Sequence, residues 1–227
     1  TVAGTGTSGT NEDTALATSV KIGAIDGLAI NSMSDLFMAD FSNNCIRKVH
    51  ANSKVITTVA GICGPGSSEY LGDNVSAIST KLYSPTGIAV KNNGAIVIAD
   101  SNNHRIRQVD TNEIITTIVG GGASGFSGVS SIAIDARLNN PKSVTTTNDG
   151  AIIISDYGNR KIRKIDRNGI VTVIAGSGAK GFGGDGGSAL NAFLNNAGKV
   201  VVTDDGDVLF ADTGNNRIRK VFSNGTI

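Results

Sequence analysis

The stretch ADTGNNRIRKV at residues 211–221 decides the fold, because the chain contains four versions of it. Each version joins an aspartate to an asparagine-rich turn and then to a short basic segment. The other three are ADFSNNCIRKV at 39–49, ADSNNHRIRQV at 99–109 and SDYGNRKIRKI at 155–165. The aspartates recur at intervals of 60, 56 and 56 residues. Repetition of this length predicts a repeat architecture.

Two further phrases accompany each copy. A segment such as GIAVKNNGAIVIAD (87–100) precedes it, and VITTVAG (55–61), IITTIVG (114–120) or IVTVIAG (170–176) follows three of the four. Each unit therefore contains four short strands that are rich in β-branched residues and separated by turns of Asn, Asp and Gly. Asn-Gly at 168–169 and 224–225 predicts type I′ hairpin turns. We also expect one helical turn within SALNAFL (188–194).

Four antiparallel strands per unit predict an all-β fold, a β-propeller of four-stranded antiparallel blades. A β-solenoid and a β-sandwich fit less well, because solenoid repeats are usually shorter and sandwiches lack such self-similarity. We expect a single domain over residues 1–227, with repeat units at about 5–61, 62–120, 121–176 and 177–227 plus 1–4.

Residues 1–4, TVAG, supply the phrase that the last unit lacks after NGTI at 224–227. In a closed ring the N-terminal strand would complete the last blade and remove two sheet edges. The four units would otherwise be a segment of a larger propeller. Acting between chains, the same complementarity would build a head-to-tail filament.

Four aspartates and four arginines occupy equivalent positions in the repeat. An aspartate at a strand end accepts hydrogen bonds from the turn that follows it. A residue needed once in every unit is expected to hold the unit together. The alternative is a ring of arginines that binds sulfated or phosphorylated partners. The eight residues are Asp40, Arg47, Asp100, Arg107, Asp156, Arg163, Asp212 and Arg219.

The sequence contains no recognisable catalytic or metal-binding pattern. The two histidines, His50 and His104, lie at different places in the repeat, and neither HExxH nor GxSxG occurs. We therefore expect a protein without catalytic residues, metal or cofactor. An enzyme with its active site at the mouth of the channel is a weaker alternative.

Composition limits the partners. A net charge of +1 and 4% aromatic residues argue against binding to nucleic acid. No apolar run approaches the roughly 20 residues that span a bilayer, so we expect no membrane insertion by this segment. The remaining partners are proteins or glycans, including copies of the chain itself.

Cys45 and Cys63 would lie close together on neighbouring strands of one hairpin. They form either a disulfide, which would suit an oxidising compartment, or two free thiols. Two N-x-S/T sequons, at Asn74 and Asn224, fall in predicted loops and are possible glycosylation sites. The Asn-Gly pair at 224–225 is also explained by the turn alone.

The phrases GIAV…NGAIVIADSNNHRIRQVD and GFGGDGGSALNAFLNNAGKVVVTDDGDVLFADTGNNRIRKV resemble NHL repeats. They are most similar to the long-linker form with GFxGDGG between units, which occurs in secreted and cell-surface proteins, including the propeller of teneurins. The GDGG phrase is intact only at 184–187. It is GDNV at 72–75, GVSS at 128–131 and EDTA at 12–15, so four equivalent loop sites are not implied.

The resemblance implies a non-enzymatic interaction or scaffold propeller, which presents loops to protein or glycan partners. Together with the cysteines and sequons, it favours an extracellular or cell-surface location. The alternative is a structural protomer of an extracellular filament or surface coat, assembled head to tail.

Overall fold

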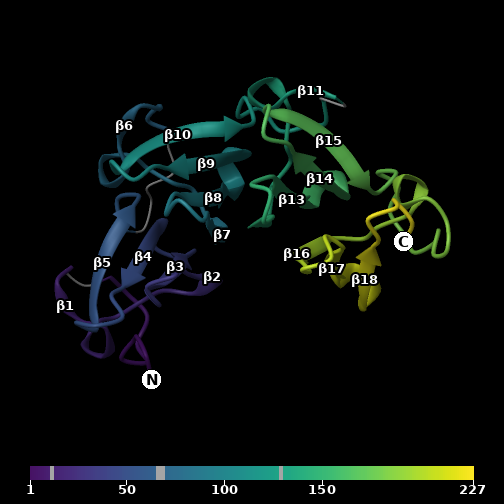
Figure 1. Cartoon of the computed structure of the whole chain (residues 1–227). Helices are drawn as coiled ribbons and strands as arrows, with labels where there is room; N and C mark the ends of the chain where they lie inside the picture. The colour runs from purple at the N-terminus through teal and green to yellow at the C-terminus, as the bar shows by residue number, and fades with distance from the viewer. Residues whose placement is uncertain (11–12, 65–69, 128–129) are drawn as a thin grey trace. The chain divides into compact units, whose positions relative to one another are not determined.

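A computed structural model describes residues 1–10, 13–64, 70–127 and 130–227. Short strands joined by turns and single-turn 3-10 helices form four separate antiparallel sheets (Figure 1). Each sheet contains one copy of the quoted repeat. The predicted all-β fold of antiparallel propeller blades is therefore confirmed. We call the sheets blades 1 to 4 in chain order.

Blades 1 and 2 have the same strand order. In each, a two-residue strand from the preceding linker pairs with the last long strand of the blade. Blade 1 has the order β1-β5-β4-β3-β2, with β1 (Ala15–Leu16), β2 (Ile25–Ile30), β3 (Leu36–Asp40), β4 (Cys45–Val49) and β5 (Val55–Ala60). Blade 2 has the order β6-β10-β9-β8-β7, with β6 (Val75–Ser76), β7 (Pro85–Val90), β8 (Ile96–Asp100), β9 (Arg105–Val109) and β10 (Ile114–Val119).

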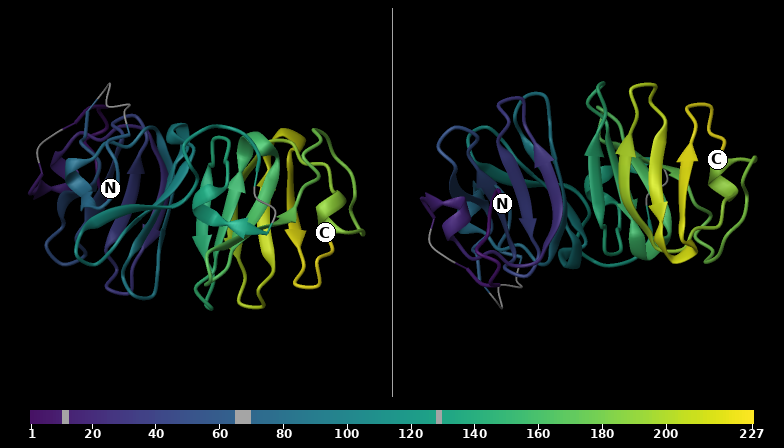
Figure 2. Two further views of the ribbon diagram at one scale, coloured as in Figure 1. Left: turned by 90° about the horizontal axis from the view of Figure 1, so that it is seen from above. Right: turned by 90° about the horizontal axis from the view of Figure 1, so that it is seen from below.

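Blade 3 repeats this order and blade 4 has three named strands (Figure 2). Blade 3 has the order β11-β15-β14-β13-β12, with β11 (Ser131–Ile132), β12 (Ser143–Thr146), β13 (Ile152–Asp156), β14 (Lys161–Ile165) and β15 (Ile170–Ala175). Blade 4 has the order β16-β17-β18, with β16 (Ala197–Val202), β17 (Val208–Asp212) and β18 (Arg217–Val221). Thr226 forms a single antiparallel bridge with Ser188, in the place that the linker strand takes elsewhere.

The linkers contain short 3-10 helices. Each linker contains one that begins with a buried alanine, and the backbone N–H of that alanine donates to a carbonyl in the hairpin turn after the third long strand of the same blade. These are η1 (Ala17–Ser19), η2 (Ala77–Ser79), η4 (Ala133–Asp135) and η6 (Ala189–Asn191). Helix η6 is the turn expected within SALNAFL. Three others follow the second long strand of blades 2 to 4: η3 (Ser101–Asn103), η5 (Tyr157–Asn159) and η7 (Thr213–Asn215).

The two Asn-Gly turns differ from the type I′ turns expected. Gly169 and Gly225 have φ of 75° and 85°, whereas Asn168 and Asn224 are not among the residues with positive φ. Gly169 N–H donates to the carbonyl of Asp166 at 3.1 Å. This is a type I turn followed by a left-handed glycine, the arrangement of a longer hairpin loop. Lys54 and Glu113 take the same left-handed conformation at the equivalent positions, with φ of 57° and 64°, so the turn favours glycine there but does not require it.

The chain divides into two compact units, residues 1–103 with 107–117 and residues 104–106 with 118–227. In the first unit, blade 1 packs its buried side chains, such as Phe37 and Ile46, against Ile96, Val109 and Ile115 of blade 2. In the second, Ile153 and Ile162 of blade 3 pack against the side chains of Leu194, Val200 and Phe210. The described residues contain no helix long and apolar enough to cross a bilayer.

Candidate functional site: the arginine junctions

The repeat aspartate lies at the end of the second long strand of its blade, and its side chain is fully buried. In blade 4 the carboxylate of Asp212 accepts the backbone N–H of Asn195 and the side-chain amide of Asn215, both at 2.8 Å. The same amide donates to the carbonyl of Gly181 at 2.7 Å. Asp40, Asp100 and Asp156 have equivalent bonds to linker N–H groups and turn asparagines.

The repeat arginine lies on the third long strand and reaches into the linker that precedes its own blade. In blade 4, Arg219 donates to the carbonyls of Phe193 at 2.8 Å and Gly183 at 3.1 Å. It also bonds Asp185 and lies 3.5 Å from Asp212. We call each arginine, with its strand-end aspartate and linker contacts, a junction, and number the junctions 1 to 4 with the blades.

Three of the four junctions contain a linker aspartate. Arg47 pairs with Asp13 at 2.9 Å and Arg107 with Asp73 at 3.0 Å, as Arg219 pairs with Asp185. In blades 1 and 2 a threonine hydroxyl of the last strand, from Thr58 or Thr117, donates to the same aspartate at 3.0 Å. These bonds tie the linker to both outer strands of the blade.

Junction 3 is built differently. Residue 129, which corresponds to the linker aspartate, is valine, and Val173 replaces the threonine. Arg163 donates instead to the carbonyls of Ser127 at 2.7 Å and Arg137 at 3.0 Å, and to Asp156 at 3.2 Å. Burial raises the pKa of Asp156, although Asn159, Asn139 and Arg163 each lower it, and burial lowers the pKa of Arg163.

An aromatic ring covers the guanidinium in three junctions. The ring centroids of Tyr70, Phe126 and Phe182 lie 4.9, 5.2 and 5.2 Å from the Cζ atoms of Arg107, Arg163 and Arg219. Stacking of this kind stabilises a cation that has been removed from water. Thr10 stands at the corresponding place in the first repeat. Among the described residues, only junctions 2 and 4 therefore combine a ring with a linker aspartate.

Sequence reasoning missed the linker partners, although the sequence contains the signal for them. The aspartates Asp13, Asp73 and Asp185 each precede their arginine by 34 residues. Fixed spacing between opposite charges across a repeat predicts a repeated contact. The residues around this aspartate differ between GDGG, GDNV and EDTA, which obscures the fact that the aspartate itself is constant in these three repeats.

Cys45 and Cys63 form a disulfide with a Cα–Cα distance of 5.1 Å. Cys45 occupies the position of Arg105 and Lys161 in blades 2 and 3. Those two side chains donate to the carbonyls of Gly121 at 3.0 Å and Gly176 at 2.9 Å, just after the last strand. The disulfide therefore makes covalent a link that the other two blades make with a hydrogen bond.

The remaining residues considered from sequence lie apart from one another. Both sequon asparagines, Asn74 and Asn224, are exposed. The side-chain oxygen Oδ1 of Asn224 accepts hydrogen bonds from the backbone N–H and the hydroxyl of Thr226, at 3.0 and 2.8 Å. His50 contacts the hydroxyl of Thr57 at 3.2 Å. His104 accepts the N–H of Asn140 at 3.0 Å, and burial lowers its pKa.

The described residues offer few candidate ligands for a metal ion. Within the part of the chain that the structure describes, no three His, Cys, Asp or Glu side chains form a group that could hold a metal ion. The buried charges are bound instead to backbone carbonyls and to one another.

Comparison with known families agrees with the repeat and the blades. The family model described as the teneurin NHL domain matches residues 44–127. Over these residues the chain is similar to the NHL-repeat β-propellers of teneurins. Human teneurin-4 is 38% identical over 160 residues, which cover 62% of this chain and 6% of that protein. Human teneurin-1 is 29% identical over 223 residues, which cover 87% of this chain and 8% of that protein. This chain thus spans less than a tenth of those relatives.

Solved structures share the fold at low identity. A chain in a crystal structure of a nidogen/laminin complex matches with a TM-score of 0.58 and 15% identity, over 92% of this chain and 73% of that one. A gluconolactonase from Xanthomonas campestris matches with a TM-score of 0.59 and 14% identity, over 88% and 58%. Binding proteins and enzymes both have this fold, so function has to be argued from the residues of this chain.

Proposed function

We propose that this chain is a non-enzymatic NHL propeller module of an extracellular or cell-surface protein, and that its loops bind a protein or glycan partner. One observation carries the proposal: the polar residues of the repeat are directed into its own linkers. The guanidinium groups of Arg47, Arg107 and Arg163 are fully buried. Buried and paired in this way, they support a rigid framework and are not available to a substrate or an anionic partner.

Under this proposal, the eight repeat aspartates and arginines are structural residues. The loops that they hold in place are the variable parts of the blades, as is usual for binding surfaces on repeat scaffolds. The disulfide between Cys45 and Cys63 and the teneurin relatives support an oxidising, extracellular location. Glycans at Asn74 and Asn224, both exposed in loops, fit the same location.

A cell-binding measurement tests the proposal. The tagged chain is applied to cultured animal cells, and bound protein is measured on untreated, protease-treated and glycosidase-treated cells. We expect saturable binding that one treatment removes, which identifies a protein or a glycan partner. Absence of saturable binding to any panel of cells would contradict an interaction role.

One loop residue offers a specific variant. Met33 is 69% exposed at the tip of the turn between β2 and β3, and a flexible methionine side chain can adapt its shape to a partner surface. We expect Met33→Ser to weaken cell binding. Asp205→Ser is the matched control, because Asp205 lies at the equivalent turn position of blade 4 and is also exposed.

A second candidate is head-to-tail self-assembly, and one observation favours it. Ile218 in blade 4 is 71% exposed, whereas Ile46, Ile106 and Ile162 at the equivalent positions are fully buried. In blade 1, Leu28 and Ile30 on one face of β2 are also exposed. Measurement of the solution mass by light scattering tests this candidate. A monomeric mass at all concentrations would rule it out, and Ile218→Lys would dissociate any oligomer that uses this face.

A further inference from the structure

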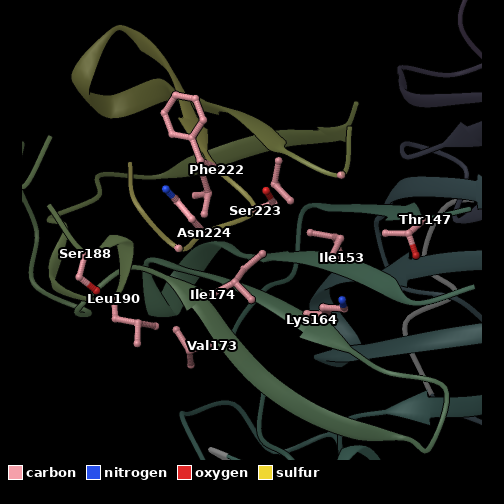
Figure 3. Close-up of a pocket in the computed structure, with 14 residues that line it drawn as sticks. Thr147, Ile153, Lys164, Val173, Ile174, Ser188, Leu190, Phe222, Ser223 and Asn224 are labelled. Carbon is pink, nitrogen blue, oxygen red and sulfur yellow. The ribbon is translucent and has the colours of Figure 1, made fainter. Parts of the chain in front are cut away.

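Blade 3 faces blade 4 across a cavity of about 460 Å³ within the second unit (Figure 3). Its apolar lining comes from both blades and from the linker between them. The side chains are Ile153, Val173, Ile174, Leu190, Val208 and Val221. A volume of this size lies in the range of sites that hold small organic molecules.

The same inter-blade position in the first unit is filled. Phe37 occupies the place in blade 1 that Ile153 occupies in blade 3, two residues beyond the aligned turn of each repeat. The Phe37 ring packs against Ile96 and Val109 of blade 2, the counterparts of Val208 and Val221. Ile153 packs in the same way with Val208 and Val221, but its side chain is smaller than that of phenylalanine and therefore fills less of the space between the two blades.

A second difference concerns the lysine beside this position. In blade 1, Lys48 pairs with Asp35 at 2.8 Å, and in blade 4, Lys220 pairs with Asp207 at 2.6 Å. The equivalent lysine of blade 3 is Lys164, and the equivalent of the aspartate is Ala151. No ion pair of Lys164 is seen within the described residues, and its side chain lines the cavity. Lys164 therefore lacks the ion-pair partner that Lys48 and Lys220 have, and its ammonium group can attract an anion.

The other charged groups around Lys164 do not replace the missing aspartate. One acidic group that interacts with it is Asp149, whose pKa is lowered mainly by hydrogen bonds from Thr147 and Ala151 and only in part by the charges of Lys164 and Arg167. Asp149 is exposed and does not line the cavity. No carboxylate belongs to the lining, where Lys164 is the one charged side chain among the described residues.

Polar groups stand at the edge opposite the lysine. Ser223 and Asn224, on the segment that leaves β18, face Ile153 and Lys164 of blade 3 across the cavity in Figure 3. The Asn224 carbonyl oxygen is already bound by Thr226. The hydroxyl of Ser223, in the same lining, is a polar group that can donate to an anionic or polar ligand group.

We propose that the cavity between blades 3 and 4 binds a small amphiphilic carboxylate, with its apolar body against Ile153, Ile174 and Val208 and its carboxylate on Lys164. The two features that distinguish blade 3 from blade 1 serve this one ligand class. Isoleucine in place of phenylalanine provides the space, and alanine in place of aspartate leaves the cation unpaired. Neither an uncharged apolar molecule nor a cation uses both features.

Three probes of one shape test the charge requirement: 4-phenylbutyrate, 4-phenylbutan-1-ol and 4-phenylbutylamine. Binding to the intact chain is followed by the NMR shifts of isoleucine and valine methyl groups. For a ligand of this size we expect a Kd on the order of 1 mM for the carboxylate. We expect the alcohol to bind about tenfold more weakly, since it lacks the charge-assisted bond, and the amine to bind weakest.

Variants that copy blade 1 test the residues. Lys164→Met keeps the apolar stem and should weaken binding of the carboxylate about tenfold while leaving the alcohol unchanged. Ala151→Asp should restore the internal ion pair and weaken binding similarly, and Ile153→Phe should abolish binding of all three probes. Lys48→Met is the matched control and should have no effect. Because Ile153→Phe risks overpacking, its folding is checked by circular dichroism, and Lys164→Met tests the proposal independently.

The proposal is overturned if 4-phenylbutyrate fails to shift the methyl groups around the cavity. It is also overturned if the alcohol and amine bind as tightly as the acid, or if Lys164→Met and Lys48→Met behave alike.

Discussion

Junctions 3 and 4 hold the same arginine with different partners. At junction 4 the arginine is shared between a buried aspartate and a linker aspartate that is 55% exposed. At junction 3 the linker carboxylate is replaced by valine in the sequence, and the arginine bonds two carbonyls and the buried Asp156. The position of the guanidinium is thus maintained with either set of acceptors, provided that it remains enclosed. The net stability that the arginine contributes, however, depends on how much of its charge is balanced by carboxylates that stay in contact with water in the folded protein.

The largest difference is expected when each arginine is removed. Arg163→Met leaves the fully buried carboxylate of Asp156 without its countercharge, so we expect a loss of roughly 3–5 kcal/mol. Arg219→Met should cost less, because Arg219 lies farther from Asp212, at 3.5 Å, and Asp185 can return to water. Urea denaturation followed by circular dichroism measures both values, with Arg163→Lys as a control that keeps the charge. An equal loss of stability for Arg163→Met and Arg219→Met would contradict the expected difference between junctions 3 and 4.

Blade 1 has a covalent link at a position where blade 3 has a hydrogen bond. The disulfide joins residues 18 apart in the sequence, at the place where blade 3 uses the bond from Lys161 to the carbonyl of Gly176. We expect reduction of the disulfide to cost about 3 kcal/mol, mainly through the greater freedom of the unfolded chain. Thermal melts with and without dithiothreitol measure this loss. The variant Cys45→Lys, which copies blade 3, should melt lower than the oxidised protein and should not respond to the reductant.

The aromatic ring can be tested by copying the threonine of the first repeat. The ring of Phe182 stacks on two arginines, with its centroid 3.8 Å from the Cζ atom of Arg217 and 5.2 Å from that of Arg219. We expect Phe182→Thr to cost roughly 1–2 kcal/mol through lost packing and lost attraction to the cations. Phe126→Thr at junction 3 should cost more, since no linker aspartate remains to balance the arginine. Both values come from urea denaturation, and Phe182→Leu separates packing from the ring. A smaller loss for Phe126→Thr would show that the ring and the aspartate act independently.

How much of this was accessible from the sequence depends on the range of each interaction. The blades followed from local signals, since β-branched segments and Asn, Asp and Gly turns recur with each repeat. Asp212 as an acceptor for its own turn is equally local, with Asn215 three residues away. The partner of Arg219 is 34 residues distant, so only comparison across repeats could have identified it. The absence of threonine at Val173 together with the absence of aspartate at position 129 is a paired change of the same kind.

The cavity beside blade 3 was beyond sequence reasoning for a different reason. It results from the volume of one side chain at an interface between blades, and no pattern of hydrophobic residues distinguishes Phe37 from Ile153 as core positions. Ile218 is another such case, since it is exposed although its three counterparts in the repeat are fully buried. Periodicity predicts which side chains face a blade interface, but it does not predict which of them pack against another side chain there.

The smallest expected effect concerns the linker aspartate itself. Asp185→Val gives junction 4 the residue that the third repeat has, and we expect a loss of at most about 1 kcal/mol, because the carboxylate is more than half exposed. The loss should shrink in 1 M salt, which screens a pair at the surface. The corresponding variant at junction 2, Asp73→Val, is measured for comparison. Asp73 is less exposed than Asp185 and also accepts bonds from Tyr70 and Thr117 at 2.8 and 3.0 Å, so its replacement removes an acceptor from two hydroxyl donors. Its cost should therefore exceed that of Asp185→Val and should persist at high salt. If both variants respond alike to salt, the linker aspartates contribute by charge alone, and the hydrogen bonds that distinguish one junction from another contribute nothing measurable.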